Sequence, residues 1–270
     1  MNNLSVCYKI CCSCNRQCSY CMNNYVCKKP QENKLYKLVL TAINSFNRKL
    51  HLDITGGEPT SCTNFIDIFR YACNLPNIQK IILSTNGNPD FDFSMILKSI
   101  LKVEINLIIV SVHLEHFDSR VFNTINALQP TNLEVRIPYL PRYYSLVLDI
   151  LKKLQKYSLY KLILLPIIHP SIKYTEKDRD FIRYINKSDE AFLPETKGKF
   201  CISSGLNIVP DGKWNMCNSS KIYNKPIFLY KSIENTIMQC NYHRCFQFSE
   251  NHRIFNSLQE ANLHKNDIIF

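Results

Sequence analysis

The sequence predicts an α/β fold in which a parallel β-sheet is covered by helices. Short runs rich in β-branched residues alternate along the chain with amphipathic segments, and the β-branched runs are almost continuously apolar. Strands of this kind are buried on both faces, which is typical of a parallel sheet built from βαβ units. The six repeats of this pattern fit an open doubly wound sheet or an incomplete (β/α)6 barrel, and periodicity alone does not decide between them.

The individual elements follow from local composition and from the spacing of apolar residues. Runs of β-branched and other apolar residues predict strands over 5–11, 50–55, 80–85, 105–112, 133–139 and 161–167. Apolar residues at three-and-four spacing predict helices over 34–46, 64–73, 92–101, 119–128 and 145–155. Each predicted helix lies between two successive strands, as a parallel sheet requires.

Four short motifs lie where predicted strands end. CNRQCSYC follows the first strand, GGEP follows the second, STNG ends the third and SVH ends the fourth. The functional loops of parallel α/β folds follow the carboxyl ends of the strands, and these ends share one edge of the sheet. We therefore expect the four motifs to meet at one site.

The pattern changes after about Pro194 to short polar segments that contain several cysteines. The tripeptide PDG at 210–212 predicts a hairpin between two short strands. We therefore expect two domains, which are residues 1–190 and residues 191–270.

Charge and cysteine content limit the classes of protein to consider. The 33 Lys and Arg residues against 22 Asp and Glu residues give a net charge of +11. This excess either attracts an acidic partner, such as an electron-carrier protein, an acidic peptide or nucleic acid, or reflects a lysine-rich background. The 13 cysteines are odd in number and unevenly spaced, which favours metal ligation over a secreted disulfide framework. Neither a membrane-spanning apolar run nor a signal-peptide pattern is present, so we expect a cytoplasmic protein.

The spacing of the first cysteine motif favours an iron–sulfur cluster. Cys14, Cys18 and Cys21 follow the pattern C-x3-C-x2-C. A structural zinc site takes four ligands, commonly in C-x2-C pairs. A [4Fe-4S] cluster presents four irons, of which a short loop can reach three, so one iron is left for a ligand that is not protein.

The same motif in its fuller form, C-x3-C-x-Y-C, is followed by GGEP after the second strand. Together they resemble the radical S-adenosylmethionine (SAM) superfamily over roughly residues 5–170. The resemblance implies a partial (β/α)6 TIM-like barrel and a [4Fe-4S] cluster whose open iron chelates SAM. It also implies reductive cleavage of SAM to a 5′-deoxyadenosyl radical, which takes a hydrogen atom from the substrate.

The resemblance assigns roles to matching positions of this chain. The cluster ligands would be Cys14, Cys18 and Cys21, and Tyr20 would lie beside the adenine of SAM. The methionyl ammonium would be bound by Gly56, Gly57 and Glu58, because glycines let backbone approach closely and a carboxylate suits a cation. The polar positions near the ribose and carboxylate of SAM would be Ser84, Asn86, Ser111 and Arg136.

Three neighbouring residues have less definite assignments. His113 either faces the substrate or is an ordinary structural or exposed histidine. Cys11 and Cys12 precede the motif, where free cysteine packs as a small hydrophobic residue, and we leave both out of the cluster.

A second group of cysteines lies near the carboxyl end of the chain. The pattern C-x10-G-x4-C, from Cys201 to Cys217, resembles the opening of the auxiliary cluster domains called SPASM and of their single-cluster form, twitch. With Cys240 and Cys245 the group provides four ligands, which suits one auxiliary Fe–S cluster and the twitch form. A Zn(Cys)4 site is the alternative. The C-x4-C spacing of Cys240 and Cys245 departs from the expected spacing, so the identity of the fourth ligand stays open. His243 is a second candidate for this ligand.

Three functions follow from these assignments. The first is a radical SAM enzyme that modifies a peptide by oxidation or cross-linking. The second is a radical SAM enzyme acting on a small metabolite, such as a sugar or cyclitol, or on RNA, although the sequence has no recognised RNA-binding module. The third is a non-enzymatic Fe–S or zinc protein. Without a nucleotide-binding fingerprint of its own, the enzyme would take its electron from a low-potential ferredoxin or flavodoxin.

Overall fold

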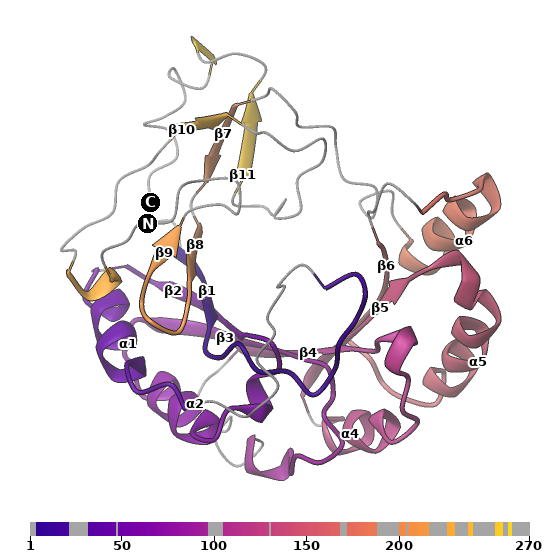
Figure 1. The fold of residues 1–270 in the computed structure, drawn as a ribbon, viewed down its shortest axis with the longest axis horizontal. Coiled ribbons are helices and arrows are strands. Elements are labelled where there is room, and N and C mark those ends of the chain that lie inside the picture. Colours follow the sequence, from indigo (N-terminus) through magenta and orange to yellow (C-terminus); the bar gives the residue numbers. More distant parts are fainter. Residues whose placement is uncertain are drawn as a thin grey trace.

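The computed structural model describes residues 4–21, 32–46, 48–96, 105–129, 131–167, 172–187, 200–203, 205–215, 226–229, 237–239, 252–255 and 259–260. Its main feature is an eight-stranded sheet with the order β6-β5-β4-β3-β2-β1-β8-β9 (Figure 1). The first six strands are β1 (Leu4–Lys9), β2 (Leu50–Thr55), β3 (Ile78–Thr85), β4 (Ile105–Ser111), β5 (Asn132–Tyr139) and β6 (Lys161–Pro166). These six strands are parallel and pair in sequence order, which confirms the α/β fold with a partial barrel.

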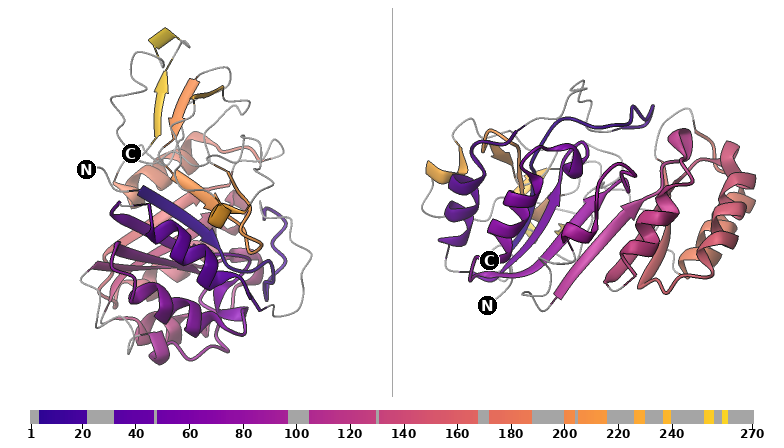
Figure 2. Two further views of the ribbon diagram at one scale, coloured as in Figure 1. Left: turned by 90° about the vertical axis from the view of Figure 1, so that its left-hand side faces the viewer. Right: turned by 90° about the horizontal axis from the view of Figure 1, so that it is seen from below.

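Helices cover the outer face of the curved sheet, as Figure 1 shows, and Figure 2 (right) looks onto this layer from below. They are α1 (Tyr36–Asn44), α2 (Phe65–Cys73), α4 (Val121–Ala127) and α5 (Tyr144–Leu154), with α6 (Glu176–Asn186) following β6. Four of the five predicted helices are confirmed to within a few residues, whereas the one predicted over 92–101 extends beyond the described residues. The sequence reading missed α6, whose capping box between Thr175 and Asp178 marks its start.

The core lies between the sheet and the helices. Leu50, Leu52 and Ile54 of β2 are fully buried, whereas the alternate residues of this strand are only half-buried. The period of two sends these two sets to opposite faces of the sheet. The polar set that includes Asp53 therefore faces the concave interior, toward the site.

The hairpin predicted at PDG is present. Strands β8 (Gly205–Ile208) and β9 (Trp214–Asn215) are antiparallel, and Gly212 closes the turn with a φ of 79° and an N–H bond to the carbonyl of Val209. Strand β8 also pairs in parallel with β1 and extends the main sheet. Part of the range 191–270 therefore belongs to the barrel sheet.

A separate antiparallel sheet has the order β10-β7-β11, formed by Ile237–Gln239, Phe200–Ser203 and His252–Phe255. In Figure 1 it lies on the side of the main sheet opposite α1 and α2. Three short 3-10 helices that follow barrel strands border the site, namely η1 (Pro59–Ser61), η2 (Leu114–His116) and η3 (Pro141–Tyr143), and η4 (Ile227–Leu229) packs against α1. No described helix is both long enough and apolar enough to cross a bilayer.

Candidate functional site

The four strand-end motifs meet at one cavity of about 430 Å³. Its lining includes ten of the eleven positions that the sequence assigned to the cluster and SAM. They are Cys14, Cys18, Tyr20, Cys21, Gly56, Gly57, Glu58, Ser84, Asn86 and Ser111. The sequence reading did not anticipate Arg16, Thr55, Thr85 or the segment 165–167 at the end of β6, which also line it. The carboxyl ends of β1 to β4 and β6 therefore enclose one common space.

The GGEP loop lies directly against the cysteine loop. The N–H of Gly57 donates to the carbonyl of Cys11 at 3.0 Å, and the N–H of Glu58 donates to the carbonyl of Ser13 at 2.7 Å. A Cβ atom at Gly57 would lie 2.2 Å from the Ser13 carbonyl oxygen, and one at Gly56 would lie 2.8 Å from that of Cys11. Both positions require glycine because two backbones cross here with no room for a side chain.

The Glu58 carboxylate is fully buried and organises the loop after β3. One oxygen accepts bonds from the N–H and hydroxyl of Thr60 and from the hydroxyl of Thr85, and the other accepts from the N–H of Asn86 at 2.6 Å. Burial raises the pKa of this carboxyl, and the four donors oppose the shift. The side chain therefore holds Thr85 and Asn86 in place, and its predicted contact with the methionyl ammonium stays a prediction.

Asn86 provides an unpaired acceptor at the cavity. Its Nδ2 donates to Asn15 Oδ1 at 2.6 Å and approaches Cys14 Sγ at 3.7 Å. Its Oδ1 is buried and has no hydrogen-bond partner among the described residues. A buried acceptor without a donor is costly, so this oxygen suits a ligand that carries N–H or O–H groups.

His113 lies between Cys18 and Tyr20. Its Nδ1 is 3.4 Å from Cys18 Sγ and 2.9 Å from the Tyr20 hydroxyl, and the two rings stack with centroids 5.9 Å apart. Burial, with a contribution from Arg16, lowers the pKa of His113 to about 4, so the ring is neutral at pH 7. His113 therefore lines the cavity, and its contact with a substrate stays a prediction.

The described cysteines of the first motif are free thiols. Burial raises the pKa of Cys18 to about 11 and raises that of Cys14. Iron ligation therefore has to displace protons from both sulfurs. Cys11, in contrast, is buried, lies outside the cavity lining and directs its thiol to the carbonyl of Glu58 at 3.3 Å.

A carboxylate from the loop after β4 holds the cysteine loop. Glu115 accepts bonds from the N–H of Ser19, at 2.7 Å, and from its hydroxyl, and it forms an ion pair with Arg142 of η3. Ser19 lies between Cys18 and Cys21, so this contact fixes the segment that carries both thiols. The Glu in SVHLEH was the only sequence signal for it, and a glutamate in a loop is too common to single out.

Of the eleven positions assigned to the first cluster and to SAM, Arg136 alone does not line the cavity. It forms an ion pair with Glu134 on the same face of β5 and interacts electrostatically with Asp53. Its predicted contact with the SAM carboxylate stays a prediction. Ser84, which does line the cavity, donates to Asp53 at 2.9 Å.

Asp53→Asn is expected to stabilise the protein at neutral pH. Burial raises the pKa of Asp53 from 3.8 to about 6, so the folded state holds this proton more tightly than the unfolded state. The resulting stabilisation is fully present below pH 3.8 and is lost as the pH rises through about 6. Asparagine keeps an acceptor for Ser84, so the variant should gain about 1–3 kcal/mol at neutral pH. Urea unfolding across this pH range measures the free energy of unfolding. If that free energy fell with pH as steeply in the variant as in the wild type, Asp53 would not be the group responsible.

The auxiliary cysteines lie mostly outside the described residues. Cys201 is in β7, where only the backbone is described, and Cys217, Cys240 and Cys245 are in undescribed segments, as is His243. Across the described ranges no three His, Cys, Asp or Glu side chains are close enough to share one metal ion. A [4Fe-4S] cluster does not need such a grouping, because each cysteine binds a different iron.

The described residues fit a [4Fe-4S] cluster with SAM. Three thiols from one loop line the cavity, Gly56 and Gly57 line it beside them, and Asn86 Oδ1 lacks a donor among the described residues. The thiols would hold the cluster, and the glycine loop and Asn86 would contact the amino acid or ribose portion of SAM.

Solved structures share this fold. The crystal structure of Streptococcus suis SuiB bound to the precursor peptide SuiA has a TM-score of 0.62 at 13% identity, covering 85% of this chain and 63% of that one. Native anSMEcpe with bound AdoMet and Cp18Cys peptide has a TM-score of 0.58 at 16% identity, covering 80% of this chain and 74% of that one. At such identities these likenesses show the fold alone.

Sequence comparison finds two curated relatives, both GTP 3′,8-cyclases. The protein from Pasteurella multocida is 29% identical over 121 residues, which are 43% of this chain and 34% of that protein. The protein from Shewanella denitrificans is 35% identical over 81 residues, which are 28% of this chain and 23% of that protein. The matches thus span about a third or less of the relatives' length.

A family model also matches most of the barrel. The model of the Radical SAM superfamily covers residues 8–184, which include all four strand-end motifs. The chain belongs to the radical SAM superfamily.

Proposed function

We propose that this chain is an enzyme that uses SAM and a [4Fe-4S] cluster to remove a hydrogen atom from a substrate. The observation that carries the proposal is the meeting of Cys14, Cys18 and Cys21 with the GGEP loop and the unpaired Asn86 oxygen in one cavity. When bound, the cluster and SAM together supply reductive cleavage of the sulfonium and abstraction of a hydrogen atom. A purely structural Fe–S or zinc site would not require the GGEP loop or the unpaired Asn86 oxygen. Absence of SAM binding would therefore favour a structural site.

The chain's own residues hold and shield the reactants. The three thiolates ligate the cluster, and Glu115 fixes the loop between two of them through Ser19. Tyr20 borders the cavity beside them and is assigned to the adenine of SAM. The apolar segment 165–167 at the end of β6 forms part of the cavity wall and would limit the access of water there.

A peptide is the first candidate substrate. SuiB and anSMEcpe, both with the barrel fold of this chain, have each been crystallised with a peptide. The proposed reaction is oxidation or cross-linking of that peptide. The net charge of +11 is compatible with an acidic one.

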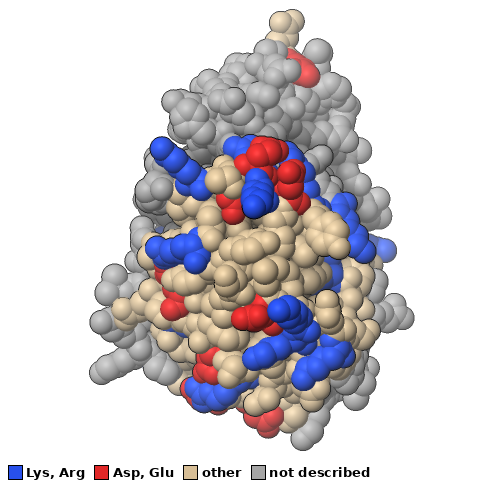
Figure 3. All heavy atoms as spheres, turned by 90° about the vertical axis from the view of Figure 1, so that its right-hand side faces the viewer, with Lys and Arg blue, Asp and Glu red and all other residues tan. Residues whose placement is uncertain are grey.

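A small nucleotide is the second candidate. The two curated relatives are GTP 3′,8-cyclases, and the aligned region of the first covers 43% of this chain. RNA has less support. On the face shown in Figure 3, basic side chains lie among acidic ones and form no continuous stripe there. Ion pairs such as Arg183 with Glu176 and Lys152 with Asp149 also mix the two signs of charge.

We further propose that residues 191–270 carry an auxiliary Fe–S cluster of the twitch or SPASM type, with Cys201, Cys217, Cys240 and Cys245 as ligands, beside a barrel domain at 1–190. A Zn(Cys)4 site is the alternative, and iron and zinc analysis of the purified protein separates the two. The external electron would come from a ferredoxin or flavodoxin. Because such donors are commonly acidic, their reduction of this basic chain should slow as salt increases.

A deuterium-transfer experiment tests the function. Anaerobically reconstituted protein with SAM and reductant is presented separately with peptide, nucleotide, RNA and other small-molecule fractions from cells grown in deuterated medium. We expect deuterium in the 5′-deoxyadenosine only with the peptide fraction, as mass spectrometry can show. If deuterium came only from another fraction, the substrate would belong to the class of molecules in that fraction. Failure to form any 5′-deoxyadenosine would contradict the assignment as an enzyme.

A further inference from the structure

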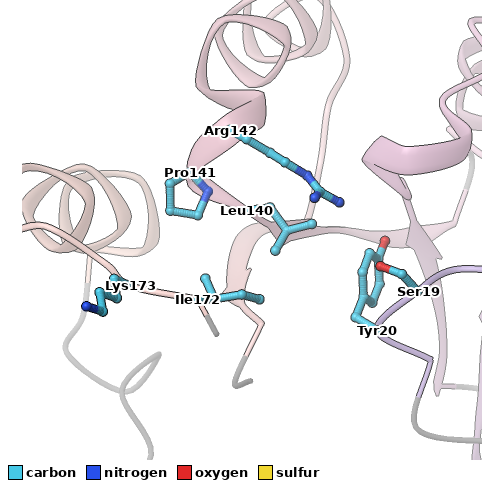
Figure 4. Close-up of a pocket in the computed structure, with 7 residues that line it drawn as sticks. All are labelled: Ser19, Tyr20, Leu140, Pro141, Arg142, Ile172 and Lys173. Carbon is cyan, nitrogen blue, oxygen red and sulfur yellow. The ribbon is translucent and has the colours of Figure 1, made fainter. Parts of the chain in front are cut away.

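A second cavity lies beside the cysteine loop and has a volume of about 410 Å³. Its walls come from Ser19 and Tyr20, from residues 140–142 after β5 and from residues 172–173 after β6, as Figure 4 shows. Tyr20 borders this cavity and also the one assigned to the cluster and SAM. The two cavities therefore meet at the residue between Ser19 and Cys21.

This position is next to the proposed reaction centre. Substrates of parallel α/β folds bind beyond the carboxyl ends of the strands, and the second cavity lies beyond those of β5 and β6. The first cavity already contains the motifs assigned to the cluster and SAM. A substrate held in the second cavity would thus reach the first one past the ring of Tyr20.

The charge that borders the second cavity is positive. Arg142 extends toward Tyr20, whereas Lys173 lies at the opposite end of the lining, beyond Ile172 (Figure 4). No Asp or Glu belongs to the described lining. The lining therefore contains two cationic residues, of which Arg142 points into the cavity and Lys173 lies at its border with its ammonium directed outward.

The ion pair of Arg142 leaves its cation available. The side chain of Glu115 is 11% exposed and that of Arg142 is 62% exposed, so the pair buries its anion and presents its cation to the cavity. Both oxygens of Glu115 are already occupied by Ser19. A guanidinium carries five N–H donors, and the bond to Glu115 uses one of its groups, which leaves donors for the planar fork that matches a carboxylate.

The cavity is apolar between these two cations. Leu140 is almost fully buried, and Pro141 and Ile172 beside it are half-buried. Figure 4 shows the three side chains between Arg142 and Lys173. An occupant therefore needs an anionic group together with an apolar one.

On the basis of the proposed function, we propose that the second cavity binds the peptide substrate through an acidic residue flanked by apolar residues. The carboxylate pairs with Arg142 or Lys173, and the neighbouring apolar side chain packs on Leu140, Pro141 and Ile172. Nucleotide phosphates offer the same charge, so GTP is the competing occupant that the experiment has to exclude.

Binding of defined probes to the SAM-loaded, anaerobic holoprotein tests this proposal. The probes are the capped peptide Leu-Asp-Leu-Asp-Leu, its Asn-containing counterpart and GTP, with affinities measured by calorimetry. We expect the acidic peptide to bind roughly fivefold more tightly than its amide counterpart. Arg142→Gln and Lys173→Glu should each reduce this preference. The cluster spectrum of Arg142→Gln reports whether Glu115 still holds the cysteine loop.

Lys152→Glu is the matched control, because it makes the same charge change at an exposed helix position paired only with Asp149. It should leave the peptide preference intact. An equal loss in this control, or no preference in the wild type, would overturn the proposal, and GTP binding that alone responds to Lys173→Glu would reassign the cavity to phosphate. Formation of 5′-deoxyadenosine by the same wild-type sample is measured in parallel. Cleavage of SAM without a peptide preference would overturn only the peptide-binding role proposed for the second cavity. A peptide preference without SAM cleavage would overturn the proposed function.

Discussion

Alanine at any one of Cys14, Cys18 and Cys21 is expected to reduce SAM cleavage to background. All three thiols come from one loop and line the same cavity, and no other cysteine of the described residues lines it. Each cysteine would bind a different iron, and losing one leaves the cube with two protein ligands. Iron content, visible absorption and 5′-deoxyadenosine formation after anaerobic reconstitution measure the loss.

Cys12→Ala is the control for this series. Cys12 belongs to the same segment but does not line the cavity, so this variant should keep its iron and its SAM cleavage. Retained cleavage in any of the three motif variants would refute the ligand assignment. Loss in Cys12→Ala would instead indicate that the whole segment tolerates no change.

Gly57→Ala is expected to have the next largest effect. The added Cβ would lie 2.2 Å from the Ser13 carbonyl oxygen and 2.6 Å from that of Cys12. Both atoms are backbone, so no rotamer change relieves the clash, and the cysteine loop has to move by about 1 Å. Overpacking of this kind costs about 1–3 kcal/mol or more. We therefore expect a lower unfolding temperature and a loss of most of the bound iron.

Gly87→Ala separates loss of the cysteine loop from general destabilisation. Gly87 has a φ of 69°, and its added Cβ would lie 2.7 Å from a Val121 methyl group, so this variant is also strained. The strain falls between β3 and α4 rather than on the cysteine loop. Gly87→Ala should lower the unfolding temperature and keep its iron, and equal iron in the two variants would contradict the role given to Gly57.

Local pattern was sufficient to predict the parallel sheet. The strand predicted over 50–55 has those limits in the structure, because Leu50, Leu52 and Ile54 supply the buried alternation. The addition of β8 to the sheet was not predictable in this way. Only four residues of β8 pair with β1, and pairing between segments about 200 residues apart has no local signal.

The site was predicted at the level of motifs rather than of contacts. Strand-end placement was enough to bring Cys14, Gly57 and Asn86 to one cavity, since parallel strands end at the same edge. The orientation of the Glu58 carboxylate depends on Thr85 and Asn86, which only the fold brings near it. The contact of Glu58 with the methionyl ammonium stays a prediction, whereas its bonds to Thr85 and Asn86 had no signal in the sequence.

The parallel pairing of β1 with β8 also bears on how the protein is made. Ser5 pairs with Gly205, so one edge of the first strand stays open until about 200 further residues have left the ribosome. At 5–20 residues per second, this interval lasts about 10–40 s. During it the nascent barrel exposes an unpaired strand directly before its cysteine loop, which is an edge on which other chains can assemble. Chains that stop before β8 should therefore aggregate even though all six strands predicted from the sequence are present.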